Sequence, residues 1–70
     1  MIDRILYTEV CAYMRERMQL SGRSTKPLRD AETCMIGVLT VDEQCGISDS
    51  ARRRSAFSFA SRYIEEANAR

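Results

Sequence analysis

The fold class is decided by residues 55–64, which read SAFSFASRYI. Placed at 100° per residue, the apolar side chains of this stretch fall on one side of a helix and the serines fall mostly on the other. The apolar side consists of Ala56, Phe57, Phe59, Ala60, Tyr63, Ile64 and, one turn later, Ala67. Ala56 and Ala60 lie four residues apart, which predicts close approach by another helix, with the rings packed along the edges. We expect Ser48, or else Ser50, to be the N-cap of this helix and residue 67 or 68 to end it.

A second amphipathic helix is expected over residues 3–20. Asp3 is its expected N-cap, and Ser21-Gly22 is its expected end. The apolar face is formed by Ile2, Leu6, Tyr7, Val10, Cys11, Tyr13, Met14 and Met18. This face covers close to half of the circumference, which is more than one packed neighbour requires. It therefore predicts two neighbours, one within the chain and one outside it.

The middle of the chain predicts a third main helix. Thr25 is its expected N-cap, and Pro27 follows near the first helical position, where the missing N–H does no harm. Apolar residues then recur at helical spacing, at Leu28, Ala31, Cys34, Met35, Val38 and Leu39, with Ile36 on the polar side. A strand over residues 35–41 is the competing prediction, because short apolar runs are ambiguous.

The segment Thr40-Val41-Asp42-Glu43 has the pattern of a capping box, in which Thr40 bonds forward and Glu43 bonds back. This pattern predicts one short extra helical turn, ended by Gly46. The expected architecture is thus a single all-α domain over residues 1–70, with three main helices and one short extra turn.

A chain of 70 residues can build only a thin core, since Ile, Leu, Val and Phe together number 14. Small domains of this kind usually gain stability from disulfides, a metal or a second subunit. Three cysteines, at positions 11, 34 and 45, form no CxxC pair, and the chain has no histidine. We therefore expect free thiols, no metal and no cofactor, and a homodimer or a complex with another protein.

Several function classes are disfavoured by composition. Catalysis near neutral pH usually uses histidine or a tuned carboxylate, whereas here histidine is absent and the carboxylates fall at predicted caps or on polar helix faces. The three glycines are isolated, so no phosphate-binding loop is expected. The longest uncharged run, residues 33–41, is nine residues, and a bilayer needs about 20. We therefore expect a protein that is not an enzyme and has no small-molecule substrate. We expect it in the cytoplasm, because the start of the chain lacks an apolar signal core.

The basic run Arg52-Arg53-Arg54 allows two hypotheses. Residues 40–54 resemble a helix-turn-helix of bacterial and phage repressors, in which these arginines would contact phosphates or guanine edges. The pattern departs from that motif at Asp42, where a small residue is expected, and at Arg52, where a β-branched residue is expected. The alternative is that the arginines pair with acidic groups of the chain or of a partner, among them Glu32, Asp42, Glu43 and Asp49.

A protein-binding surface is the leading hypothesis for function. Aromatic residues, Met and Arg are enriched at interfaces, and two of the predicted helices carry them on broad faces. The candidate partner-binding residues are Tyr13, Phe57, Phe59 and Tyr63, with Arg52, Arg53 and Arg54 as a charged rim.

In its size, its start, its Cys and Met usage and the central stretch of residues 21–28, SGRSTKPL, the chain resembles small accessory proteins of enterobacterial temperate phages and prophages. The resemblance implies a broad class of function. Such proteins bind and inhibit or redirect a host factor, or they regulate phage transcription.

Overall fold

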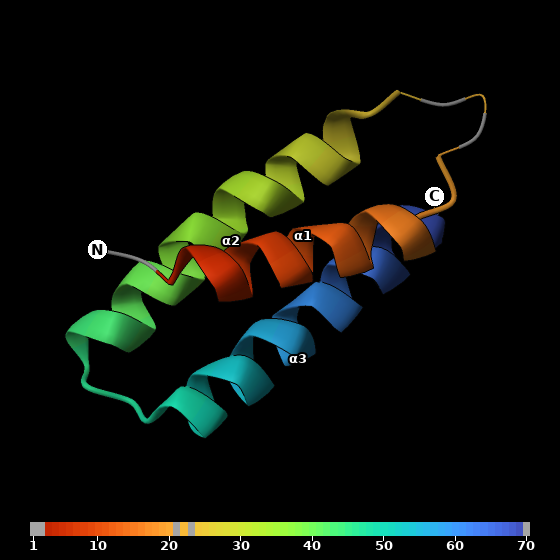
Figure 1. Ribbon diagram of the computed structural model, residues 1–70. Helices are drawn as coiled ribbons and strands as arrows, with labels where there is room; N and C mark the ends of the chain where they lie inside the picture. The colour runs from red at the N-terminus through yellow and green to blue at the C-terminus, as the bar shows by residue number, and fades with distance from the viewer. Residues whose placement is uncertain (1–2, 21, 23, 70) are drawn as a thin grey trace.

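The computed structural model describes residues 3–20, 22 and 24–69, and the part of the chain that it describes is all-α. Three helices follow one another along the sequence: α1 (Arg4–Arg17), α2 (Lys26–Gln44) and α3 (Asp49–Asn68) (Figure 1). The strand expected as an alternative over residues 35–41 is not formed, because this run lies inside α2.

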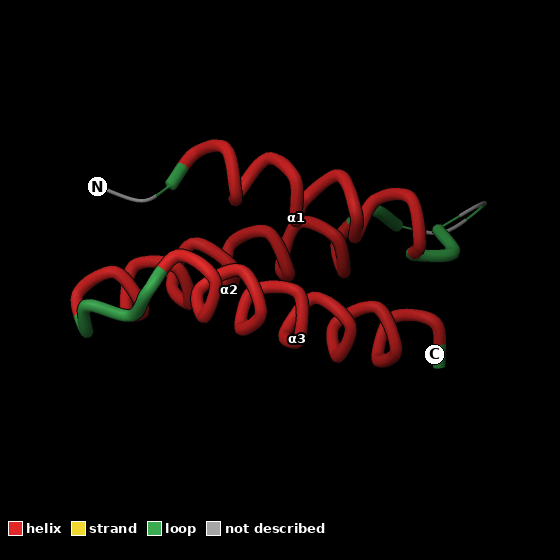
Figure 2. The backbone as a smooth tube through the Cα atoms, turned by 60° about the horizontal axis from the view of Figure 1, so that its bottom comes forward, coloured by secondary structure: helices red, strands yellow, loops and turns green. Residues whose placement is uncertain are grey.

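The helices form an elongated bundle of 40 × 17 × 16 Å (Figure 2). α1 and α3 run in the same direction, and α2 runs antiparallel to both (Figure 1). Each helix contacts the other two. The N-terminal ends of α1 and α3 therefore lie at one end of the bundle, and their C-terminal ends lie at the other.

The core is built unequally by the three helices. α1 and α2 supply the largest fully buried side chains, which are Val10, Met14, Met35 and Leu39. α3 buries only alanines: Ala56, Ala60 and Ala67. Because alanine side chains are small, they allow helix backbones to approach closely, and α3 contacts both α1 and α2. The predicted position of Ala56 and Ala60 at the buried centre of the stripe is confirmed.

Two of the expected helix starts are confirmed by their hydrogen bonds. The Asp3 carboxylate accepts a hydrogen bond from the Leu6 N–H at 3.1 Å, and the Ser48 hydroxyl accepts one from the Ala51 N–H at 3.4 Å. Thr25 occupies the N-cap position of α2 without a side-chain bond to the helix. Gly46 follows α2 with φ of 70°, a conformation that favours glycine, and the chain turns there toward α3.

The predicted extra turn after the second helix is wrong. The Thr40 hydroxyl donates to the Ile36 carbonyl at 2.7 Å inside α2, and the Cys45 N–H donates to the Val41 carbonyl at 2.9 Å. A capping threonine needs an extended backbone, but here the buried positions Met35, Leu39 and Asp42 continue in helical register, so α2 runs unbroken to Gln44.

The first helix is shorter than expected. It ends at Arg17, and Met18 has an extended backbone with its side chain buried in the core. The predicted end at Ser21-Gly22 falls partly outside the described residues, since Ser21 is not among them.

Candidate protein-binding surface

The structure divides the predicted partner-binding residues between two faces. All four candidate aromatic side chains are half-buried against the core. Because the buried alanines occupy the centre of the α3 stripe, the rings lie on its two edges. Phe57 lies on the edge beside α1, and Phe59 and Tyr63 lie on the edge beside α2.

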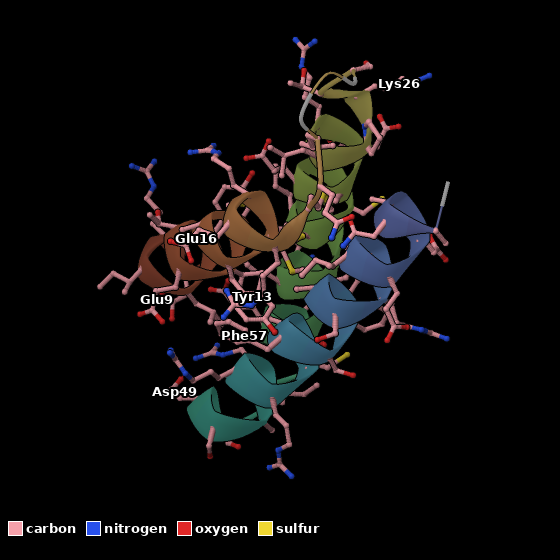
Figure 3. All side chains as sticks on the ribbon, turned by 90° about the vertical axis from the view of Figure 1, so that its right-hand side faces the viewer. Glu9, Tyr13, Glu16, Lys26, Asp49 and Phe57 are labelled. Carbon is pink, nitrogen blue, oxygen red and sulfur yellow. The ribbon has the colours of Figure 1, made fainter. Side chains whose placement is uncertain are left out.

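On the α1 side, aromatic rings alternate with arginines in what we term the α1–α3 face, made of Glu9, Tyr13, Arg17, Arg53 and Phe57. The rings of Tyr13 and Phe57 meet edge to face, with centroids 5.1 Å apart and planes at 82° (Figure 3). The Arg17 guanidinium lies 4.0 Å from the Tyr13 ring centroid, and that of Arg53 lies 5.3 Å from the Phe57 centroid. Each of the two rings on this face thus has one guanidinium beside it.

Two of the three consecutive arginines form internal ion pairs. Arg52 pairs with Asp49 one turn earlier, and Arg53 reaches across to Glu9 on α1. Arg54 is exposed and has no ion-pair partner among the described residues. Internal pairing, which was one of the two hypotheses for this run, therefore accounts for two of its members.

The geometry around the arginines differs from that of a helix-turn-helix. In that motif, two short helices cross at a steep angle, and the second enters the major groove. Here α2 has 19 residues and α3 has 20, and the two run antiparallel as a hairpin (Figure 1).

On the other side of α3 lies a second surface, the α2–α3 face, made of Cys34, Val38, Val41, Cys45, Phe59 and Tyr63. Cys34 and Tyr63 line the same pocket, and Phe59 and Tyr63 have ring centroids 6.3 Å apart. Val38, Val41 and Cys45 follow Cys34 at helical spacing, so they share its side of α2. Val41 is 56% exposed, and both cysteines are exposed.

The outer surface of α2 carries no charge over two and a half turns. Residues 33–41 include exposed side chains, yet none is Asp, Glu, Lys or Arg. The exposed positions in this run are Thr33, Cys34, Ile36, Gly37 and Val41. Solvent-facing helix surfaces usually carry charged residues, whereas charge is depleted at the centres of protein interfaces.

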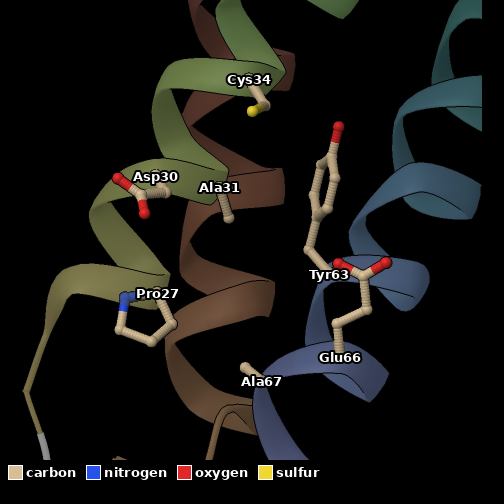
Figure 4. Close-up of a pocket in the computed structure, with 7 residues that line it drawn as sticks. All are labelled: Pro27, Asp30, Ala31, Cys34, Tyr63, Glu66 and Ala67. Carbon is tan, nitrogen blue, oxygen red and sulfur yellow. The ribbon is translucent and has the colours of Figure 1, made fainter.

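A pocket of about 140 Å³ opens at one end of the α2–α3 face (Figure 4). It is lined by Pro27, Asp30, Ala31, Cys34, Tyr63, Glu66 and Ala67. The Tyr63 ring extends from α3 toward Cys34 on α2 (Figure 4), and burial raises the pKa of its hydroxyl, with smaller contributions from Cys34 and Glu66. Pockets that hold cofactors or substrates are usually about 300–1,000 Å³, so this one fits at most a single side chain.

Two buried polar groups near the α2–α3 hairpin were missed by sequence reasoning. Asp42, predicted to lie in the capping box of a new helical turn, is only 9% exposed, and its Oδ2 has no hydrogen-bond partner among the described residues. The Nε of Arg52 is also buried and has no hydrogen-bond partner among the described residues. The capping-box pattern predicted that Asp42 begins a new helix, but α2 continues through this segment and places Asp42 on its buried side.

A further polar contact joins α1 to α2. The Tyr7 hydroxyl donates to the Glu32 carbonyl at 3.4 Å. Burial, together with the neighbouring Cys11 and Glu32, raises the pKa of Tyr7 to about 12, and burial also raises the pKa of the Cys11 thiol.

Neither a metal site nor a membrane span is found within the described ranges. No group of three or more His, Cys, Asp or Glu residues there could hold a metal ion. No described helix is long and apolar enough to cross a bilayer. Comparison with protein-family models, curated proteins and solved structures finds no match to this chain.

Proposed function

We propose that the chain is a small non-enzymatic regulatory or inhibitory protein that acts in the cytoplasm by helix-mediated protein–protein binding. The contact would be to a second copy or to a host protein, and the α2–α3 face would provide it. The resemblance to small phage accessory proteins points to the same class.

One observation carries the proposal: α2 exposes an apolar surface without charge. Val41 is 56% exposed and the thiols of Cys34 and Cys45 are accessible, while Phe59 and Tyr63 extend the same surface onto α3. Single exposed apolar residues are ordinary, but a contiguous uncharged surface is typical of an interaction site. The small size of the pocket at its end supports binding of a protein rather than a small molecule.

The helix-turn-helix hypothesis receives no comparable support. Arg52 and Arg53 are engaged with Asp49 and Glu9, which leaves Arg54 as the exposed arginine of the run without an ion pair in the described part of the chain. DNA binding by such a module depends on several cations that are free to meet phosphates.

The experiment is affinity purification with a tagged chain from cells that also express an untagged copy. Three baits are compared: the wild type, Val41→Lys on the α2–α3 face, and Ile5→Lys as a matched control. Ile5 is 75% exposed and lies on α1, away from this face. We expect the wild type and Ile5→Lys to recover the same protein, and Val41→Lys to lose it.

The proposal is wrong if all three baits recover the same proteins in equal amounts, or if none recovers any protein. Circular dichroism of the purified variants checks that each substitution leaves the helix content unchanged, as expected at exposed positions.

A further inference from the structure

Along the exposed side of α2, the order of residue types is the same in both directions. It presents Cys34, Val38, Val41 and Cys45, at successive spacings of four, three and four residues. Two such helices packed antiparallel place Cys34 opposite the second copy's Cys45, and Val38 opposite the second copy's Val41. A two-fold interface requires a surface that is complementary to itself in this way.

We propose that the α2–α3 face binds a second copy of this chain, with the two α2 helices antiparallel about a two-fold axis between residues 39 and 40. This inference rests on the proposed function and names its partner. Phe59 and Tyr63 of each copy flank the pair of α2 helices.

The α2 part of this face allows a second helix to approach closely. Gly37 lies at its outer edge, and a side chain added there would meet nothing within 4 Å, so no part of the same chain fills the space. Val38 and Val41 are short, and no charge interrupts residues 33–41. Along this run, two α2 helices can therefore come together without burying an ionised group.

The two ends of the face differ in charge, and the two-fold arrangement brings unlike ends together. Asp30 and Glu66 line the pocket at one end. Arg52 lies at the other end, two helical turns before Phe59 on the same side of α3, where its guanidinium pairs with Asp49 and stays partly exposed. The antiparallel arrangement brings the second copy's Arg52 to the end that holds Asp30 and Glu66.

The available area fits a dimer of modest size. A long side of the bundle measures about 40 by 16 Å, on the order of 640 Å² in projection, and standard interfaces bury roughly 800 Å² per partner. The accessible surface of the chain is 4846 Å². A typical monomer of 8.0 kDa exposes about 4,450 Å², and the elongated shape of the bundle accounts for the additional surface.

The register makes cysteine cross-linking a sharp test. Cys34 lies on α2 and Cys45 is the C-cap of the same helix, 11 residues later and about 16 Å along the helix axis, so the two cannot form a disulfide within the same chain. For the same reason, two Cys34 residues or two Cys45 residues in the antiparallel pair are separated by about that distance. Only Cys34 and the second copy's Cys45 come close enough to form a disulfide.

The purified chain is oxidised with diamide, which converts two neighbouring thiols to a disulfide, and is analysed on a non-reducing gel. We expect the wild type to form covalent dimers, and Cys34→Ser alone and Cys45→Ser alone to give at least tenfold less. Mixing the two single variants restores the dimer, because each supplies the thiol that the other lacks. The double variant Cys34→Ser/Cys45→Ser is the control for the buried Cys11. Cross-linking of either single variant at the wild-type level would overturn the register.

Light scattering after size exclusion gives the oligomeric state without chemistry. We expect the wild type and Ile5→Lys to be dimers of about 16 kDa, twice the 8.0 kDa of one chain, and Val41→Lys to dissociate at least tenfold more readily. A wild-type chain that is monomeric at millimolar concentration overturns the dimer.

The two proposals fail separately. If the wild type is monomeric but recovers a different protein that Val41→Lys loses, the face binds a partner and the homodimer is wrong. If the wild type is monomeric and no protein depends on Val41, both proposals are wrong.

Discussion

Asn68, near the end of α3, holds the C-terminal end of α1. Its side-chain oxygen accepts a hydrogen bond from the Gln19 N–H at 2.8 Å, and its side-chain nitrogen donates to the Arg17 carbonyl at 3.2 Å. These bonds satisfy backbone groups that a helix end leaves without partners. No sequence rule predicts the contact, because about 50 residues separate its two sides.

We expect Asn68→Ala to lower the free energy of unfolding by about 1 kcal/mol, since both bonds are lost. Urea titration at fixed protein concentration measures the change, and the melting temperature should fall by about 4–8 °C. Gln19→Ala is the control, because Gln19 takes part through its backbone. If the control destabilises the chain as much as Asn68→Ala, the bond has been assigned to the wrong group.

The raised pKa of Tyr7 predicts a loss of stability in alkali. The unfolded chain loses the Tyr7 proton near the ordinary pKa of 10.0, whereas the folded chain holds it to about 12. The neutral hydroxyl therefore contributes its full stabilisation below pH 10, and this contribution declines as the pH rises from 10 to 12.

The measurement is urea unfolding at a series of pH values from 8 to 12. Tyr7→Phe should show a shallower decline above pH 10 than the wild type, because phenylalanine has no proton to lose. Equal slopes for the two proteins would show that Tyr7 does not cause the decline.

At the scale of helices, α3 depends on the small size of its buried residues. Ala56 and Ala60 are fully buried, and the flanking rings diverge toward α1 and α2. Periodicity located this stripe in advance, and the capping preferences of Asp and Ser located the caps at Asp3 and Ser48. Periodicity also placed Phe57 and Phe59 on opposite edges of the stripe, about 200° apart, but it could not show which neighbouring helix each edge faces, because that depends on the tertiary arrangement.

We expect Ala60→Leu to lower the free energy of unfolding by about 1–3 kcal/mol, because the added carbons separate α3 from its neighbours. Ser58→Leu places the same side chain on the exposed side of α3 and should change stability by no more than about 0.5 kcal/mol. Urea titrations of the two variants test the difference. Similar losses for both would mean that α3 is not closely packed at Ala60.

The length of α2 shows where local patterns fail. Residues 40–43 satisfy a capping box when considered alone, yet the helix that precedes them is already formed, and adding residues to it is easier than starting a new one. The position of Asp42 follows from the same continuation, so its burial could not be inferred once the helix was divided at Thr40.

For the whole molecule, the distribution of charge bears on nucleic acid. Five basic side chains follow residue 50, but Arg52 and Arg53 are engaged with Asp49 and Glu9. The net charge of the chain is +1. Neither property favours a surface that attracts phosphates over a long range.

We therefore expect no gel shift of random duplex DNA at micromolar protein in low salt. The experiment is repeated at higher salt and with Arg52, Arg53 and Arg54 all changed to Ala. A shift that weakens steeply with salt and disappears in the triple variant would restore the helix-turn-helix hypothesis.

The up-down-up order of the helices determines which new connections between chain ends are possible. The N-terminal end of α1 and the C-terminal end of α3 lie at opposite ends of a bundle that is 40 Å long (Figure 1). Joining them in a circularly permuted chain would require a linker of about 12 residues to span that length when fully extended. Head-to-tail concatenation needs no such bridge, because the last helix of one unit already points toward where the next unit would begin.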